Sequence, residues 1–332
     1  MKITILEKEH LKSATNLIEQ FATDVLMGFS SRPKTLSSKY FYDDIGSQLF
    51  QQITKQKDYY PTSSEFEILS NCHTQFPLII EQKEIDIIEL GAGDGHKTKI
   101  LIENFVLEGY KINFYPIDIS HEAMKLLSAN LKESENLKIH GVVGEYIEGL
   151  RFVRQHSQNL QLVLFLGSNI GNFDRVANLG FLRKLWKSLN MGDLLFIGFD
   201  LKKDISTLTR AYNDSAGVTR DFNLNVLNRI NRELGGQFNC EYFEHFGVFN
   251  PILGAMESYL VSTRDQDIYI AELEKFFHFD AFEAIHLEYS FKYLEKDILE
   301  LAKETGYLIK QNFKDSKNYF IDSLWEVKKA IL

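Results

Sequence analysis

Five short apolar runs in the middle of the chain constrain its fold more than any other feature. They are Ile85–Leu90, Ile112–Ile117, Ile139–Val143, Leu162–Leu166 and Leu194–Phe199. Short, mainly apolar runs of this length are typical of strands that a parallel sheet buries on both faces. Longer segments with a helical apolar period, such as 97–108 and 121–133, separate them. This β-α-β-α order predicts an α/β fold with a doubly wound, Rossmann-like sheet and right-handed crossovers.

The rhythm of these segments breaks after Asp200, where a second region is inserted. Helical patterns at 205–210 and 223–234 are followed by strand patterns of an antiparallel unit at 242–248 and 256–261. A helix at 295–304 and two strands, 307–313 and 319–327, can then complete the first sheet. The stretch before Pro61 lacks the rhythm, so we expect it to pack with the insert. We therefore predict one domain of residues 62–200 and 291–332, and a second, α+β domain of residues 10–61 and 201–290.

Charge and composition exclude several classes of partner. The 332 residues include 37 Lys and Arg against 46 Asp and Glu, a formal charge of −9 that repels phosphate backbones and anionic lipid. No apolar run approaches the roughly 20 residues that span a bilayer, and the start of the chain is too acidic for a signal peptide. We expect a cytoplasmic monomer with no nucleic-acid or membrane partner. Cys72 and Cys240 stand alone, so we expect neither a disulfide framework nor a metal site.

The first apolar run leads directly into a glycine-rich turn. Ile85–Leu90 continues into Gly91-Ala92-Gly93-Asp94-Gly95, and a helix begins near Lys97. Glycines allow a strand to turn sharply into a helix while the backbone approaches a ligand, and the helix amino terminus favours an anion. A tight turn without a ligand is the alternative interpretation. Dinucleotide binding would need G-x-G-x-x-G, but here the third glycine comes one position early.

An acidic residue ends the second apolar run, at the edge of the sheet where ribose hydroxyls lie in such folds. This residue is Asp118, which could instead cap the helix that begins near His121, a role that Ser120 could share. Glu145 follows the third run, where adenine would be recognised. The glycine turn, Glu89 before it and Asp118 together form the pattern of class I methyltransferases that use S-adenosylmethionine (SAM).

Further blocks of sequence lie outside the β-α-β rhythm. They include Asp58-Tyr59-Tyr60-Pro61-Thr62 at the end of a long block from Pro33, Gly167-Ser168-Asn169-Ile170-Gly171-Asn172-Phe173, Ala211-Tyr212-Asn213-Asp214, and Glu288-Tyr289-Ser290-Phe291-Lys292-Tyr293. In residue type and order these blocks resemble the histidine-specific Nα-methyltransferases of ergothioneine biosynthesis. The resemblance spans nearly the whole chain, and it extends to fungal enzymes that methylate a prenylated tryptophan.

The resemblance implies a Rossmann-like SAM domain, a substrate domain and a set of site residues. The residues implied for SAM are Tyr59, Gly91, Lys97, Asp118 and Glu145. Asn172 and Tyr212 are implied as the catalytic pair that holds the amino and carboxylate groups of the substrate. Tyr42, Glu288 and Ser290 are implied as contacts of the imidazole, and Ser258 borders the side-chain pocket where the family usually has Met.

Each of these residues also has an ordinary structural interpretation. The aromatic residues around Tyr42 and Tyr59 could be core, since such clusters usually are. The segment 169–172 could be a strand-end turn with an Asn in the left-handed conformation. Glu288 alternates with apolar neighbours and could face solvent.

The residue types nevertheless suit methyl transfer to an amine. An amide such as Asn172 can accept from an amine and donate to a carboxylate, and Glu288 can accept an imidazole N–H. Free L-histidine, methylated to the betaine hercynine, is the expected reaction, and another amino acid or a tryptophan derivative is the alternative. An NAD-dependent oxidoreductase and a non-catalytic SAM-binding protein are more distant alternatives.

Overall fold

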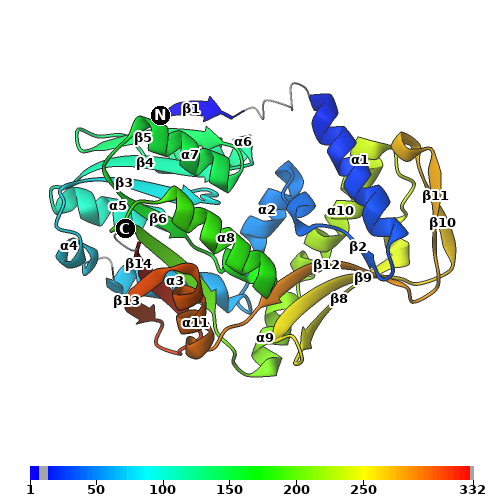
Figure 1. Ribbon diagram of the computed structural model, residues 1–332. Coiled ribbons are helices and arrows are strands. Elements are labelled where there is room, and N and C mark those ends of the chain that lie inside the picture. The colour runs from blue at the N-terminus through cyan, green and yellow to red at the C-terminus, as the bar shows by residue number, and fades with distance from the viewer. Residues whose placement is uncertain (7–13, 73, 330–332) are drawn as a thin grey trace. The chain divides into compact units, whose positions relative to one another are not determined.

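The computed structural model describes residues 1–6, 14–72 and 74–329 and divides into two compact units (Figure 1). The first comprises Met1–Leu6, Pro61–Lys202 and Phe291–Leu332, and the second Glu7–Tyr60 and Lys203–Ser290. Residues 10–13 of the predicted second domain lie outside the described residues. No helix of the described residues is long and apolar enough to cross a membrane.

An eight-stranded sheet runs through the first unit in the order β1-β5-β4-β3-β6-β7-β14-β13. Its strands are β1 (Lys2–Ile5), β3 (Glu84–Leu90), β4 (Lys111–Asp118), β5 (Leu137–Val143), β6 (Leu160–Phe165), β7 (Leu194–Asp200), β13 (Tyr307–Lys314) and β14 (Phe320–Val327). All pairings from β1 to β7 are parallel, whereas β14 is antiparallel to β7 and β13. The predicted α/β class and its five central strands are confirmed.

The chain order of this sheet reverses between β3 and β6. From β3 the chain moves outward through β4 to β5, and it then returns to place β6 on the other side of β3. In open α/β sheets, the crevice for a ligand lies at the carboxyl ends of the strands at such a switch point. The loops that follow β3 at Gly91 and β6 at Gly167 both begin there.

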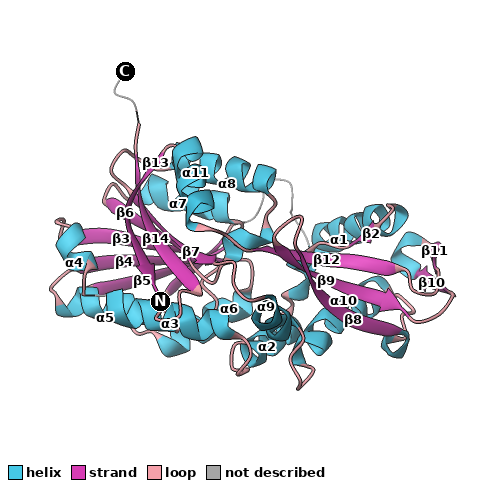
Figure 2. Cartoon of the chain, turned by 90° about the horizontal axis from the view of Figure 1, so that it is seen from below, coloured by secondary structure: helices cyan, strands magenta, loops and turns pink. Residues whose placement is uncertain are grey.

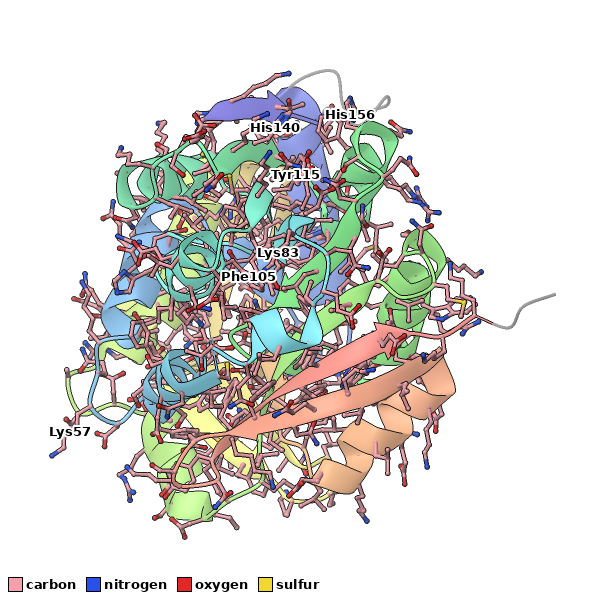
Figure 3. The ribbon with its side chains drawn as sticks, turned by 90° about the vertical axis from the view of Figure 1, so that its left-hand side faces the viewer. Lys57, Lys83, Phe105, Tyr115, His140 and His156 are labelled. Atoms are coloured by element: carbon pink, nitrogen blue, oxygen red, sulfur yellow. The ribbon has the colours of Figure 1, made fainter. Side chains whose placement is uncertain are left out.

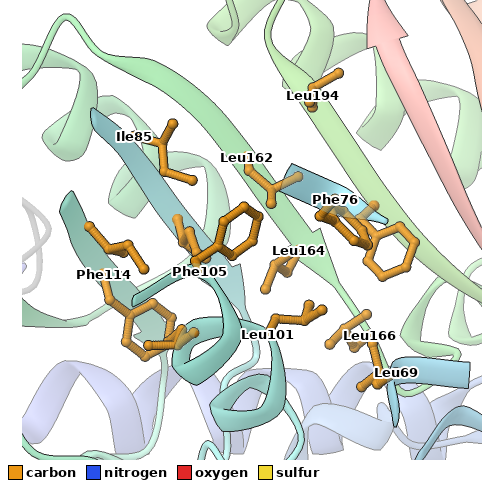
Figure 4. Packing of buried hydrophobic residues seen from close by; sticks show 14 of the residues in the cluster. Leu69, Phe76, Ile85, Leu101, Phe105, Phe114, Leu162, Leu164, Leu166 and Leu194 are labelled. Atoms are coloured by element: carbon orange, nitrogen blue, oxygen red, sulfur yellow. The ribbon is translucent and has the colours of Figure 1, made fainter. Parts of the chain in front are cut away.

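Helices cover both faces of the sheet (Figure 2). One face carries α3 (Tyr60–Cys72), α4 (Phe76–Ile79), α5 (Thr98–Leu107) and α6 (His121–Asn130); the other carries α7 (Tyr146–His156), α8 (Arg175–Ser188) and α11 (Glu295–Thr305). Figure 4 shows Leu101 and Phe105 of α5 packed with Ile85 and Leu162 of the sheet. Each such fully buried side chain contributes about 1.5–3 kcal/mol, which is why the central strands are mainly apolar in sequence.

The first strand departs from the prediction for the amino-terminal stretch. Instead of packing with the insert, β1 pairs in parallel with β5, and Thr4 Oγ1 lies 2.8 Å from His140 Nε2. The His140 ring lies beside Tyr115 of β4, with ring centroids 5.9 Å apart (Figure 3). A four-residue edge strand with mixed polarity carries no apolar run, so periodicity did not reveal it.

The described residues of the second unit form a four-stranded sheet, a hairpin and four α-helices, with short 3₁₀ helices between them. The sheet order is β2 (Lys34–Thr35), β12 (Ala284–Phe291), β9 (Ala255–Ser262) and β8 (Phe243–Asn250), and the hairpin is β10 (Gln266–Ile270) with β11 (Lys275–Phe279). The helices are α1 (Ala14–Ser30), α2 (Asp44–Ile53), α9 (Ile205–Tyr212) and α10 (Val218–Leu234).

The core of the second unit joins the amino-terminal stretch to the insert. Phe21 and Phe29 of α1 pack with Val226 of α10 and Leu260 of β9, and β2 pairs in parallel with β12. Both α1 and β2 of the amino-terminal stretch thus contact elements of the insert. The predicted antiparallel pair, β8 with β9, is confirmed.

Candidate active site

The turn after β3 is built from glycines in the left-handed region. Gly91, Gly93 and Gly95 have φ values of +77°, +54° and +69°. A Cβ on Gly91 would lie 2.9 Å from the hydroxyl oxygen of Tyr146, so a larger residue there would be both strained and crowded. The turn leads into the amino terminus of α5, and a helix amino terminus favours an anionic ligand group.

Asp118 ends β4 and binds the same turn. Its carboxylate accepts hydrogen bonds from the backbone N–H of Gly93 at 3.1 Å and from that of Ser120 at 2.8 Å. Burial raises the pKa of Asp118, and the backbone N–H groups oppose that shift. The cap of α6 is the Ser120 hydroxyl, which accepts from Ala123 N, so the alternative of Asp118 as the helix cap is wrong.

Lys97 stands at the start of α5, where its ammonium forms an ion pair with Glu65 of α3. Burial lowers the pKa of Lys97, but the negative charge of Glu65 outweighs that effect and raises it. Glu89, the acid before the glycine turn, is buried and accepts from the Thr98 hydroxyl. Burial raises the pKa of Glu89 to about 8. Two buried carboxyl groups, Glu65 and Glu89, and the half-buried Lys97 thus lie near the glycine turn.

The raised pKa of Glu89 predicts a pH-dependent stability. Between its ordinary value of 4.5 and about 8, the folded protein keeps a proton on Glu89 that the unfolded chain has lost. The stability of the wild type should therefore fall as pH rises through this window, by on the order of 1 kcal/mol per pH unit. We expect Glu89→Gln to lack this slope in denaturant unfolding without SAM from pH 5 to 9. Parallel stability curves would contradict the prediction.

Two side chains that the sequence did not single out lie against the glycine turn. Besides Tyr146 of α7, the amide nitrogen of Asn169 would lie 3.4 Å from a Cβ on Gly91. Burial raises the pKa of Tyr146, so its hydroxyl stays neutral. Glu145, the predicted adenine contact, is exposed at the residue before α7 and its side chain makes no capping bond. In the sequence, the position of Tyr146 directly after Glu145 was the feature that could have pointed to Tyr146 as a neighbour of the glycine turn.

The loop after β6 carries Asn172 at the end of a short 3₁₀ helix, η2 (Asn169–Asn172). The buried Tyr293 hydroxyl donates to the Ile170 carbonyl oxygen at 3.2 Å and accepts from the Asn178 amide at 2.9 Å. The left-handed residues of this loop are Gly167 and Ser168, so the alternative of a left-handed Asn is wrong. Asn172 is half-buried, and the hydrogen bonds of Tyr293 stabilise the turn that carries it.

In the second unit, Tyr212 ends α9 and its hydroxyl donates to the Ser290 hydroxyl at 2.6 Å. His245 Nε2 lies 2.9 Å from the carbonyl oxygen of Tyr212, and burial lowers the pKa of His245. The Asn213 side chain bonds both the N–H and the carbonyl of Gly247 on β8. A Cβ on Gly247 would lie 2.9 Å from that amide, so the close approach requires glycine.

Strand β12 presents Glu288 and Ser290 in a stretch where the alternation of side chains is interrupted. The rings of His286 and Tyr289 lie 4.0 Å apart, although residues three apart on a regular strand point to opposite faces. Glu288 lies within this interruption and is half-buried, so it is not on an exposed face. Ser290 is buried.

Tyr42, Tyr59 and Ser258 complete the predicted set within the second unit. Tyr42 meets Phe50 and Phe222 edge-on, with ring centroids 5.6 and 5.7 Å away, and Tyr59 meets Phe50 at 6.3 Å. Both tyrosines are half-buried. Ser258 is buried on β9, where its partner in the sheet is Gly247. Ser258 therefore lies beside the strand that holds the Tyr212 loop.

Each unit thus gathers part of the predicted set. In the first, Gly91, Lys97, Asp118 and Asn172 all follow or end strands at the carboxyl edge of the parallel sheet. In the second, Tyr212 and Ser290 are hydrogen-bonded.

Comparison with known proteins gives a family and named relatives. A family described as histidine-specific methyltransferase, SAM-dependent, matches residues 21–327. The histidine N-alpha-methyltransferase of Mycolicibacterium smegmatis is 35% identical over 296 residues, which cover 89% of this chain and 91% of that protein. The ergothioneine biosynthesis protein 1 of Neurospora crassa is 30% identical over 284 residues, 82% of this chain but only 31% of the fungal protein.

Solved structures of methyltransferases are similar at low identity. One is the 1,6-didemethyltoxoflavin N1-methyltransferase of Burkholderia thailandensis with S-adenosylhomocysteine bound. It is 9% identical, the match covers 98% of this chain and 92% of that chain, and the TM-score is 0.36.

Proposed function

Because the chain belongs to the family of histidine-specific, SAM-dependent methyltransferases, it methylates histidine on nitrogen with SAM, and we propose that it carries three methyl groups to the α-nitrogen of free L-histidine. The product would be the betaine hercynine. The observation that carries this proposal is the family match, which runs through both units rather than through the SAM fold alone.

For the cofactor, the first unit offers groups that suit each part of SAM. The Asp118 carboxylate can bind the ribose hydroxyls, and the glycine turn with Lys97 can receive the carboxylate of the methionine part. Glu145 and Tyr59 are the further SAM contacts that we propose. SAM supplies a methyl group on a positively charged sulfur.

For the substrate, the proposed contacts divide between its polar end and its ring. The Asn172 amide can accept from the α-amine and donate to the α-carboxylate, and the Tyr212 hydroxyl adds a phenolic donor. Glu288 and Ser290 can serve the imidazole, with Tyr42 and Ser258 beside them. The Tyr212–Ser290 hydrogen bond supports this set, because it joins a residue proposed for the polar end to one proposed for the ring.

The chemistry needs positioning more than a strong base. Displacement at the SAM methyl requires a neutral amine whose lone pair is in line with the sulfur–methyl bond, so alignment and exclusion of water supply most of the acceleration. The amine can lose its proton to water before transfer. Asn172 and Tyr212 then hold it at the attacking position.

Asp118→Ala should weaken SAM binding tenfold or more. The change removes a charge-assisted bond to the ribose, worth on the order of 1.5–3 kcal/mol. Titration calorimetry with SAM and with its demethylated product measures the effect, and a melting curve checks that the variant folds. Unchanged affinity in a folded variant would show that the ribose lies elsewhere.

The direct test of the function is turnover of methyl-labelled SAM with a panel of free amino acids and with tryptophan derivatives. We expect histidine to accept three methyl groups on its α-nitrogen, localised by mass spectrometry. A preference for a non-imidazole amino acid would overturn the proposed substrate. We also propose that the enzyme is a cytoplasmic monomer, which sizing by light scattering and fractionation of cells would test.

A further inference from the structure

Glu65 is a buried carboxylate that the proposed reaction does not yet use. It lies on α3 with no exposed surface, and its two oxygens have different partners. One forms the ion pair with the Lys97 ammonium, and the other accepts the backbone N–H of Gly167 at 2.6 Å. Lys97 follows the glycine turn after β3, and Gly167 begins the loop after β6. One carboxylate therefore ties together two loops at the switch point of the sheet.

Stability alone does not account for a charge in this place. Burying an ion pair costs desolvation, and apolar residues of similar volume are often as stabilising. The Lys97 side chain is 28% exposed, whereas that of Glu65 is fully buried. A ligand can therefore reach the lysine of this ion pair but not the glutamate. An ammonium has three N–H donors, which lets it bind a second anionic group while it stays paired with Glu65.

A second acid, Asp322, lies beside Glu65. Asp322 of β14 is fully buried, and a Cβ on Gly198 would lie 2.6 Å from a Glu65 oxygen and 3.1 Å from an Asp322 oxygen. Burial and the negative charge of Glu65 raise the pKa of Asp322 well above its ordinary range. Burial thus disfavours a charge on Asp322, and Glu65 is the acid that lies in contact with the Lys97 ammonium.

We propose that Glu65 is a positioning residue for methyl transfer. It holds the Lys97 ammonium toward the carboxylate of SAM, and through the Gly167 N–H it fixes the loop that leads to Asn172. This inference rests on the proposed function, in which Lys97 contacts SAM and Asn172 contacts the amino acid.

Two substitutions at Glu65 separate its two bonds. Glu65→Gln keeps a carbonyl oxygen for the Gly167 N–H but removes the charge opposite Lys97, so we expect the Kd for SAM to rise about tenfold while the KM for histidine stays nearly unchanged. Glu65→Ala removes both bonds and should raise the KM for histidine as well. Glu67→Gln is the matched control, because it makes the same change on the same helix at a carboxylate that binds Ser316 N. It should leave both constants unchanged.

The decisive measurement adds Lys97→Met alone and combined with Glu65→Gln, with melting curves to confirm folding. If Glu65 acts through Lys97, the double variant binds SAM no more weakly than Lys97→Met. Additive losses, or a Glu65→Gln variant with wild-type affinity while Lys97→Met binds weakly, would overturn this inference and leave the proposed function intact. Unchanged affinity in Lys97→Met would overturn the placement of SAM, and this inference with it.

Discussion

Asn172→Ala should lose methyl transfer by about a hundredfold or more while SAM binding stays close to wild type. The proposed partner of the Asn172 amide is the polar end of the amino acid, and a reacting group misplaced by even 1 Å can cost about a hundredfold. The η2 turn is held by Tyr293 and Asn178, which the substitution does not touch, so the loop should keep its conformation. The measurement is kcat and KM for histidine beside the Kd for SAM.

The SAM titration is the internal control for this variant. Asn172→Asp adds a second test, because it keeps the size of the side chain but replaces the N–H donors with a charge that repels the substrate carboxylate. We expect it to be as inactive as the alanine variant. If either variant turned over histidine at nearly the wild-type rate, another residue would have to hold the polar end.

The parallel sheet could be predicted from the sequence because its signal is local. Each buried strand is a short, mainly apolar run, and the glycine turn follows the first of them without a gap. Because Asp118 directly follows the second apolar run, its position at the end of β4 could also be predicted. The sequence did not show which residue caps α6, since Ser120 and Asp118 are both good caps. The Ser120–Ala123 bond identifies Ser120 as the cap, and the role of Asp118 as a SAM ligand stays a prediction.

Features that depend on distant partners could not be predicted in this way. Glu65 lies in Ser63-Ser64-Glu65-Phe66-Glu67, a sequence typical of a solvated helix, and its partners Lys97 and Gly167 are 32 and 102 residues away. The interruption in β12 is equally invisible, because Leu287 to Phe291 reads as a regular alternating strand. Glu288, which lies within this interruption, is half-buried.

Glu288→Ala should cost the enzyme its preference for histidine by roughly 1–3 kcal/mol, which is about fivefold to 150-fold in relative kcat/KM. In the variant an imidazole N–H enters the pocket without its acceptor, and a site built around a hydrogen bond discriminates strongly through that bond. Glu288→Gln keeps a carbonyl acceptor and should lose less. Glu272→Ala, a change at an exposed glutamate of the same unit, is the matched control.

Ser258 decides how the result with Glu288 is interpreted. Replacing the Met usual in the family with this buried serine frees volume, so the pocket can hold a water or a larger side chain. Competition among histidine, tryptophan, tyrosine and ring-methylated histidines should therefore be run for the wild type, Glu288→Ala and Ser258→Met. We expect Glu288 to dominate, with histidine first for the wild type and still first for Ser258→Met. A Glu288→Ala variant that selects histidine as well as the wild type does would show that the Glu288 carboxylate does not recognise the imidazole ring. The selection of the substrate would then depend on Ser258 and the tyrosines.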